Sequence, residues 1–242
     1  MHKRLSTLVL ASLFTTSAWA APQAKNIIFF LGDGMGPTTI AAARIFRHGE
    51  EGLLNFERLE RTARIKTYSN DFQTTDSAPS MGAYMTGVKI NQDGISMKDA
   101  RAIDPEKDAN GNRTIDKCGA NNGYVAPTIL ELAKAKGKAV GAVTTTELTH
   151  ATPASTFSHV CHRDAAYTIA RQIVPGGEGY NLALKDGVDV LMGGGRHHFT
   201  PYDKATNPRG RADGRDLMAE FGAQGYAVGR TRADMMSARP GR

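Results

Sequence analysis

The stretch TTDSAPSMG places two chemically useful side chains next to each other, Asp76 and Ser77. Small residues follow the pair, so the backbone there can approach a ligand closely, and Pro79 suits the first turn of a helix. Asp and Ser are also favoured helix caps, because their side-chain oxygens accept hydrogen bonds from the free backbone donors of the first turn. The stretch alone therefore leaves two interpretations open, a helix cap and a nucleophile.

A second carboxylate, Asp33, lies in LGDGMG directly after the apolar run NIIFF. The glycines are similar to a dinucleotide-binding fingerprint. However, Pro37 replaces the third glycine, and Asp33 puts a negative charge where a pyrophosphate needs backbone donors. A carboxylate between glycines at the end of a strand suits a divalent cation better. The alternative is a plain Asp-Gly turn.

The third stretch, TTTELTHATPAS, contributes His150 and Thr152, and Arg163 follows at the start of a predicted helix. In an extended segment His150 and Thr152 would point to the same side, where a nitrogen and a hydroxyl oxygen can share a cation. The alternative is a histidine in a polar loop with Thr152 as a helix cap. Arg163 can present its planar fork to a phosphoryl group, or it can be a surface residue paired with an acid.

The elements that must position these side chains alternate along the chain. Apolar or alternating runs predict strands, and periodic segments between them predict helices. Such alternation predicts an α/β fold, a mainly parallel sheet flanked by helices on both faces, with ligands at the carboxyl ends of the strands. The expected strands are residues 26–31, 64–69, 139–144 and 188–192, the expected helices are residues 37–46, 128–136, 164–173 and 215–221, and residues 92–122 are expected to form an insertion or long surface loop.

The N-terminus differs from the rest of the chain. A basic start, a short apolar run and the small residues of Ala18-Trp19-Ala20 predict a secretory signal over residues 1–20, with cleavage after Ala20. The apolar run is too short to span a bilayer, and no later segment reaches about 18 consecutive apolar residues. We therefore expect a secreted or periplasmic protein with no membrane anchor after cleavage.

Composition excludes some classes of protein. Of the 242 residues, 40% are hydrophobic and 22% are charged, an ordinary balance for a globular protein. The sequence pI is about 9.4, but the basic residues are scattered among acidic ones, which argues against nucleic acid as a specific partner. Cys118 and Cys161 are the two cysteines. They form a disulfide or remain two free thiols, and the sequence does not decide between these states.

Taken in order, NIIFFLGDGMG, TTDSAPSMGAYMTG and TTTELTHATPAS resemble the alkaline phosphatase family, with GGGRHHF as weaker support, over roughly residues 25–230. The resemblance implies a binuclear zinc pair and a nearby magnesium. It implies that Asp33 bridges magnesium and one zinc, and that Ser77 is a metal-bound nucleophile that becomes phosphoserine. It also implies that His150 and Thr152 are magnesium-site residues and that Arg163 clamps the phosphate.

The implied activity is phosphomonoester hydrolysis, with a homodimer as the implied assembly. Family members are longer and draw further ligands from a C-terminal half, so we interpret residues 21–242 as the N-terminal part of a truncated catalytic domain with impaired activity. The alternative is a catalytically silent remnant that binds metal or phosphate. A related sulfatase or phosphodiesterase is disfavoured by Ser77, because those enzymes typically use a Cys-derived or Thr nucleophile. The adjacent His197 and His198 match no family ligand and are interpreted as polar loop residues.

Overall fold

The computed structural model describes residues 24–109, 111 and 118–238. The predicted signal at residues 1–20 lies outside these residues. The chain divides into two compact units, one ending at Gly32 and one running from Asp33. Of the first unit the structure describes only residues 24–32, in which no helix or strand forms. The second unit carries all of the elements described below.

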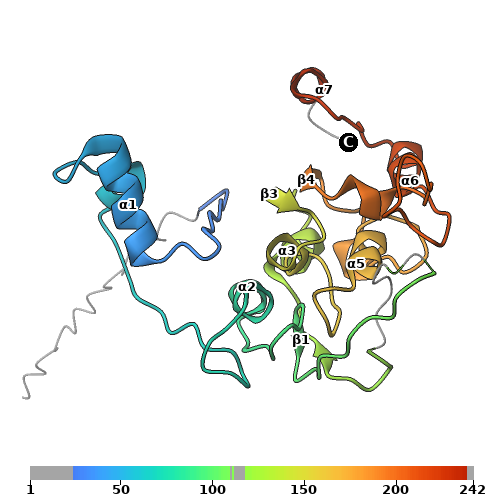
Figure 1. The fold of residues 1–242 in the computed structure, drawn as a ribbon, viewed down its shortest axis with the longest axis horizontal. Helices are drawn as coiled ribbons and strands as arrows, with labels where there is room; N and C mark the ends of the chain where they lie inside the picture. Colours follow the sequence, from blue (N-terminus) through green and yellow to red (C-terminus); the bar gives the residue numbers. More distant parts are fainter. Residues whose placement is uncertain (1–23, 110, 112–117, 239–242) are drawn as a thin grey trace, which may run out of the picture. The chain divides into compact units, whose positions relative to one another are not determined.

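Most expected helices form close to their predicted positions, and the strands are short (Figure 1). Sequence periodicity therefore located the helices within a few residues. The α-helices are α1 (Pro37–His48), α2 (Ser77–Thr86), α3 (Ile129–Ala135), α4 (Ala151–Ala154), α5 (Ala166–Gln172), α6 (Leu217–Ala223) and α7 (Arg232–Ser237). The 3₁₀ turns are η1 (Asn55–Arg58), η2 (Leu182–Leu184) and η3 (Arg196–Phe199), and the strands are β1 (Met97–Lys98), β2 (Tyr124–Val125), β3 (Gly141–Glu147) and β4 (Val190–Gly194).

Strand pairing is limited to two small sheets in the part of the chain that the structure describes. β3 and β4 are parallel, with Gly141 opposite Val190 and Glu147 opposite Gly194. β1 and β2 are antiparallel. The α/β character and the parallel β3–β4 pair agree with the sequence prediction. The structure does not show the expected mainly parallel sheet flanked by helices on both faces.

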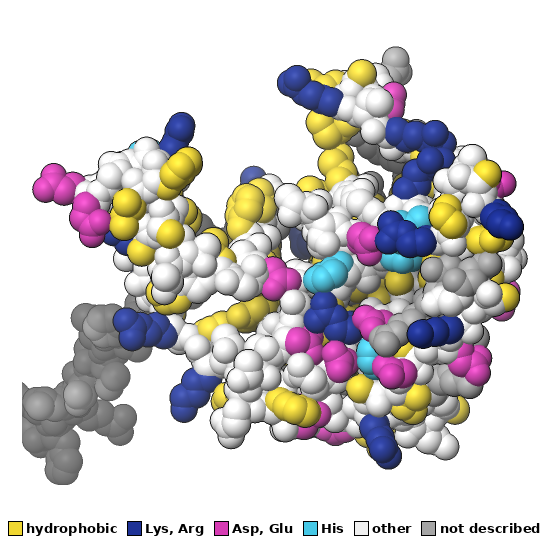
Figure 2. All heavy atoms as spheres, in the orientation of Figure 1, with side chains coloured by type: hydrophobic (Ala, Val, Ile, Leu, Met, Phe, Trp, Pro, Cys, Tyr) yellow, Lys and Arg dark blue, Asp and Glu magenta, His cyan; other side chains and the backbone are white. Residues whose placement is uncertain are grey.

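Two predicted strands are wrong, residues 26–31 and residues 64–69, since neither segment forms regular structure. Their composition favours strands, but a strand is stable only when its backbone groups pair with a neighbour and its side chains are covered. Here the apolar side chains stay exposed: Phe30 is 89% exposed and Ile65 is 62% exposed. Hydrophobic side chains at the surface are also visible in Figure 2. None of the helices among the described residues is both long and apolar enough to cross a membrane.

The core of the second unit lies among the segments that follow Ser77. Apolar side chains from α5, η2 and α6 are buried with residues from the loops between them. The largest fully buried ones include Phe157, Ile95, Ile169, Ile173, Leu184, Val188 and Leu217. α1, by contrast, buries none of its residues. The core therefore supports the segments that carry Ser77, His150 and Arg163.

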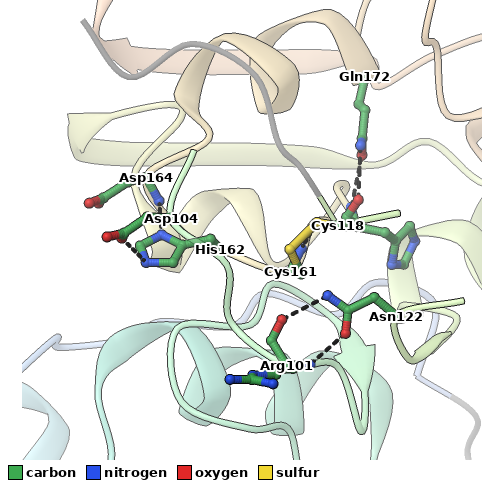
Figure 3. Close-up of a disulfide and its surroundings, with 9 residues drawn as sticks. Arg101, Asp104, Cys118, Asn122, Cys161, His162, Asp164 and Gln172 are labelled. Atoms are coloured by element: carbon green, nitrogen blue, oxygen red, sulfur yellow. Dashed lines mark hydrogen bonds and ion pairs between the residues drawn. A yellow bond between two sulfur atoms is a disulfide. The ribbon is translucent and has the colours of Figure 1, made fainter. Parts of the chain in front are cut away.

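Several of the described residues of the polar segment 92–122 are buried, which differs from the long surface loop expected for this segment. Ile95 and Ala100 are fully buried, and the side-chain amide of Asn122 exchanges two hydrogen bonds with the backbone of Arg101. Cys118 and Cys161 form a disulfide, which decides the question that the sequence left open (Figure 3). The disulfide joins the polar segment to the chain two residues before Arg163.

Candidate active site

The first helix of the site, α2, begins at Ser77, and Asp76 is its cap. The Asp76 carboxylate accepts a hydrogen bond from the backbone nitrogen of Ala78 at 2.6 Å and another from the backbone nitrogen of Asp93 at 3.0 Å. The capping interpretation is thus confirmed for Asp76. Ser77 has no capping role, and its hydroxyl points elsewhere.

Asp33 receives that hydroxyl. Ser77 Oγ donates to Asp33 Oδ1 at 3.0 Å, and Thr152 Oγ1 donates to Asp33 Oδ2 at 2.7 Å. The hydrogen bond from Thr152 holds the pKa of the Asp33 carboxyl below its usual value, against the opposing effect of partial burial. The hydrogen bond from the Ser77 hydroxyl and the charge of Arg163 act in the same direction as Thr152. Asp33 is therefore an ionised carboxylate that holds two hydroxyls.

Thr152 reaches Asp33 from a helix, which corrects the expected extended segment. α4 begins at Ala151 with His150 in the N-cap position, and the His150 side chain makes no capping hydrogen bond. Thr152 is consequently the second residue of α4, so the alternative in which it caps a helix is wrong. His150 and Thr152 nevertheless both reach the same group of side chains, through Arg163 and Asp33 respectively.

Arg163 connects the remaining members of the group. Its Nη1 donates to Asp76 Oδ1 at 3.0 Å, and its Nη2 lies 3.2 Å from His150 Nε2. Because a guanidinium only donates, His150 Nε2 accepts, and the ring proton is on Nδ1. The structure thus brings together Asp33, Ser77, His150, Thr152 and Arg163. Arg163 also pairs with an acidic residue, Asp76, as the alternative interpretation of this arginine expected.

Sequence reasoning missed Asp93 beside this group. Its backbone oxygen accepts a hydrogen bond from the Arg163 backbone nitrogen at 2.8 Å. Burial raises the pKa of its carboxyl, and the neighbouring Asp76 charge adds to the shift. Asp93 has a φ of 61°, a left-handed conformation that suits Asp and Asn in turns. The Asn-Gln-Asp-Gly turn sequence at residues 91–94 was the available signal, but a turn sequence says nothing about which helix it meets.

The donor set can be tested against the expected metals. The Asp33 carboxylate and the Ser77 and Thr152 hydroxyls are hard oxygen donors that suit magnesium. His150 Nδ1 is buried without a hydrogen-bond partner in the structure, and because it carries the ring proton it can donate to a water or a phosphate oxygen but cannot bind a cation. A catalytic zinc typically has about three protein ligands, rich in nitrogen. Within the described hydrogen-bond network of Ser77, His150 is the only imidazole, so these residues fit one hard cation and do not complete a zinc pair.

His197 and His198, interpreted from the sequence as polar loop residues, lie in η3 instead, and the structure corrects that interpretation. His198 is buried at 8% exposure. Together with Glu147 the two histidines form a compact group of ligand atoms, described further below. The signal in the sequence was GGGRHHF after β4, but Glu147 lies far from it along the chain.

Comparison with protein families matches residues 24–242 to the family described as alkaline phosphatase. The chain belongs to the alkaline phosphatase family. Its relatives include the tissue-nonspecific alkaline phosphatase of Gallus gallus, 36% identical over 223 residues that cover 81% of this chain. An alkaline phosphatase from Gadus morhua is 34% identical and covers 82% of the chain. The resemblance inferred from the motifs is therefore confirmed.

Solved alkaline phosphatases share the fold of this family member. The Thermus thermophilus alkaline phosphatase superposes with a TM-score of 0.59, at 32% identity, over 84% of this chain and 35% of its own. The chain matches 39% of the Gallus gallus relative, so it spans about two fifths of that protein. The activity, substrates and partners of the whole relatives are accordingly matters of proposal for this chain.

Proposed function

We propose that this chain carries the phosphorylated serine of a metal-dependent phosphomonoesterase. The observation that carries the proposal is the hydrogen bond of 3.0 Å from Ser77 Oγ to Asp33 Oδ1. This bond places a serine at the start of a helix against an ionised carboxylate. The Arg163 guanidinium is close by, because it donates a hydrogen bond to Asp76, the residue before Ser77. The shared family gives the substrate class, phosphate monoesters, and the implied product is a phosphoserine at Ser77.

Each side chain has a separate task in this proposal. Ser77 Oγ attacks the phosphorus atom while Asp33 accepts its hydrogen bond and orients the oxygen. The first backbone donors of α2 favour the negative charge that develops there. Arg163 turns its fork toward the nonbridging oxygens of the phosphoryl group, exchanging its bond to His150 for bonds to the substrate. The bond between phosphorus and the leaving alcohol breaks, and the departing oxygen takes up a proton in place of the one that Ser77 loses. Water later attacks the phosphorus, which releases phosphate and returns a proton to Ser77 Oγ.

Divalent cations complete this chemistry in the proposal. Asp33, Ser77 and Thr152 would hold a cation of the magnesium kind, and Asp33 and Ser77 would also contribute to one of the two zinc ions expected from the resemblance. When bound, such ions lower the pKa of a coordinated hydroxyl and neutralise charge on phosphate oxygens. A variant of the alkaline phosphatase from the Antarctic bacterium TAB5 is described with Mg bound in its M3 site. We propose the same kind of ion for the Asp33 group.

Export belongs to the same proposal. Residues 1–20 would direct secretion or periplasmic export, and the Cys118–Cys161 disulfide suits an oxidising compartment. A homodimer stays a prediction that no contact tests.

Mass spectrometry of the Ser77 peptide tests the proposal without requiring repeated turnover. The mature chain is incubated for a long period with a phosphomonoester, magnesium and zinc, quenched in acid and digested. We expect phosphate on Ser77 and none after Ser77→Ala. Ser80→Ala is the matched control, because Ser80 lies in the same helix and its hydroxyl donates to the backbone oxygen of Asp76; it should keep the label.

A second candidate function is binding of metal or phosphate without turnover. The observation that favours it is the single imidazole in the Ser77 network. In that case the same incubation leaves Ser77 unmodified while magnesium still binds. Absence of phosphate on Ser77, or its presence on another residue with Ser77→Ala unaffected, would contradict the phosphoserine proposal.

A further inference from the structure

The carboxyl ends of β3 and β4 bring together three ligand-type side chains that the Ser77 group does not use. Glu147 ends β3 and lies opposite Gly194 of β4 in the parallel register. The chain then turns at Gly195, which has a φ of 83° and is the N-cap of η3. A β-carbon at Gly195 would lie 2.8 Å from Glu147 Cβ. This glycine therefore allows η3, with His197 and His198, to begin directly over Glu147.

The three side chains have the separations of a metal-ligand group. His197 Nε2 lies 3.7 Å from Glu147 Oε1, and His198 Nδ1 lies 3.9 Å from Glu147 Oε2. One ligand atom from each residue falls within 4.8 Å of the other two, and no other such group was found among the described residues. Two imidazoles and one carboxylate form a donor set that zinc uses with a fourth, open position.

Both imidazoles are largely buried: His198 is 8% exposed, and the His197 side chain is 16% exposed. The charge of the nearby Arg209 acts on both rings. This charge opposes a cation, which will moderate affinity.

Neighbouring contacts fix the rings without closing the site. Thr149 Oγ1 lies 2.7 Å from His198 Nδ1, the nitrogen that faces Glu147, so a metal bound at Nδ1 takes the place of this hydrogen bond. The His197 and His198 ring centroids are 3.9 Å apart. The Glu147 side chain is 40% exposed, which gives an ion a route from solvent. Thr149 contacts His198 of this group, while His150, the next residue, contacts Arg163 of the Ser77 group. Consecutive residues of the chain therefore serve the two groups separately.

We propose that Glu147, His197 and His198 form a zinc-binding site at the carboxyl ends of β3 and β4, separate from the Ser77 group. A bound zinc would join the end of one strand to the turn after the other. The site does not depend on phosphoserine chemistry, so it can be tested whether or not Ser77 is phosphorylated.

The test measures zinc and cobalt binding in the mature chain carrying Asp33→Ala, which removes the carboxylate of the Ser77 group. Competition with a chromophoric chelator gives the affinity, and visible absorption of Co²⁺ reports histidine ligation. We expect one zinc per chain in this background. Glu147→Gln, a nearly isosteric change, and His197→Gln should each weaken zinc binding by more than about tenfold.

Two matched controls remove the same chemical groups elsewhere. His48→Gln takes away an exposed imidazole at the end of α1, and Glu51→Gln an exposed carboxylate after it; both should bind zinc as the background does. Circular dichroism checks that every variant keeps its fold. Equal zinc affinity in all variants, or complete loss of zinc in the Asp33→Ala background, would overturn the proposal.

Discussion

Asp33 holds two hydroxyls that come from helices far apart in the sequence. Ser77 belongs to α2 and Thr152 to α4, and both donate to the one carboxylate. The carboxylate and a hydroxyl differ in what their removal takes away. Removing the Thr152 hydroxyl deletes one neutral ligand, whereas neutralising Asp33 deletes the charge that attracts a cation. Charge and ligand number dominate affinity for hard cations.

We therefore predict a different loss of magnesium affinity for two variants of nearly unchanged shape. Asp33→Asn should weaken binding by more than about tenfold, and Thr152→Val by less than Asp33→Asn, because only the first removes an anionic ligand. Isothermal titration of magnesium into each variant measures the difference. Undiminished magnesium binding in both variants would contradict a metal-binding role for Asp33 and favour the alternative from the sequence, a plain Asp-Gly turn.

At the scale of the element, the residue that caps α2 also contacts the arginine of the candidate site. Asp76 caps the helix through Ala78 and at the same time pairs with Arg163. The side chains of this ion pair are 21% and 18% exposed, so removing the charge of Asp76 leaves Arg163 partly buried without that partner, which adds to the cost of any neutral substitution. The contribution of the cap can still be separated from that of the ion pair, because Asn keeps the cap and Ala does not.

Asp76→Ala should lower the free energy of unfolding by about 1–2 kcal/mol, since the cap is lost. Asp76→Asn should cost less, because Asn is an equally good cap, while it still removes the charge opposite Arg163. Urea denaturation of both variants compares the free energies. If the two substitutions destabilise the chain equally, the cap is not what Asp76 contributes to stability.

The helices and strands show which elements can be predicted from short stretches of sequence. Thr128 caps α3 and exchanges hydrogen bonds with Glu131, a capping box that the sequence carries within four residues. The apolar run at residues 188–192 gave β4. The equally apolar run at residues 26–31 gave no strand, because ladder hydrogen bonds need a partner that the sequence of the run does not specify.

At the scale of the whole molecule, the described residues around Ser77 offer ligands for one hard cation. A displacement between two cations needs ligands for both, and the Ser77 network contains one imidazole. Apolar side chains such as Val143, 71% exposed on β3, also remain uncovered.

We predict that residues 21–242 alone hydrolyse a chromogenic phosphomonoester at least about a hundredfold more slowly than the Thermus thermophilus alkaline phosphatase, because the described Ser77 network holds one imidazole and a pair of zinc ions needs more nitrogen ligands to stabilise the phosphoryl charge. The assay is run at alkaline pH with zinc and magnesium, together with Ser77→Ala and a count of bound metal. Rapid hydrolysis that depends on Ser77 would contradict this prediction.

The sequence by itself determined the family, the start of α2 at Asp76 and Ser77, and the positions of most helices, because caps and periodicity act between residues close together in the chain. Only the tertiary structure decided that Asp33 meets Ser77 and Thr152, and that Glu147 lies under His197. It also decided that the two cysteines pair. These contacts join residues many positions apart, and they form only when the core fixes the separate segments against one another.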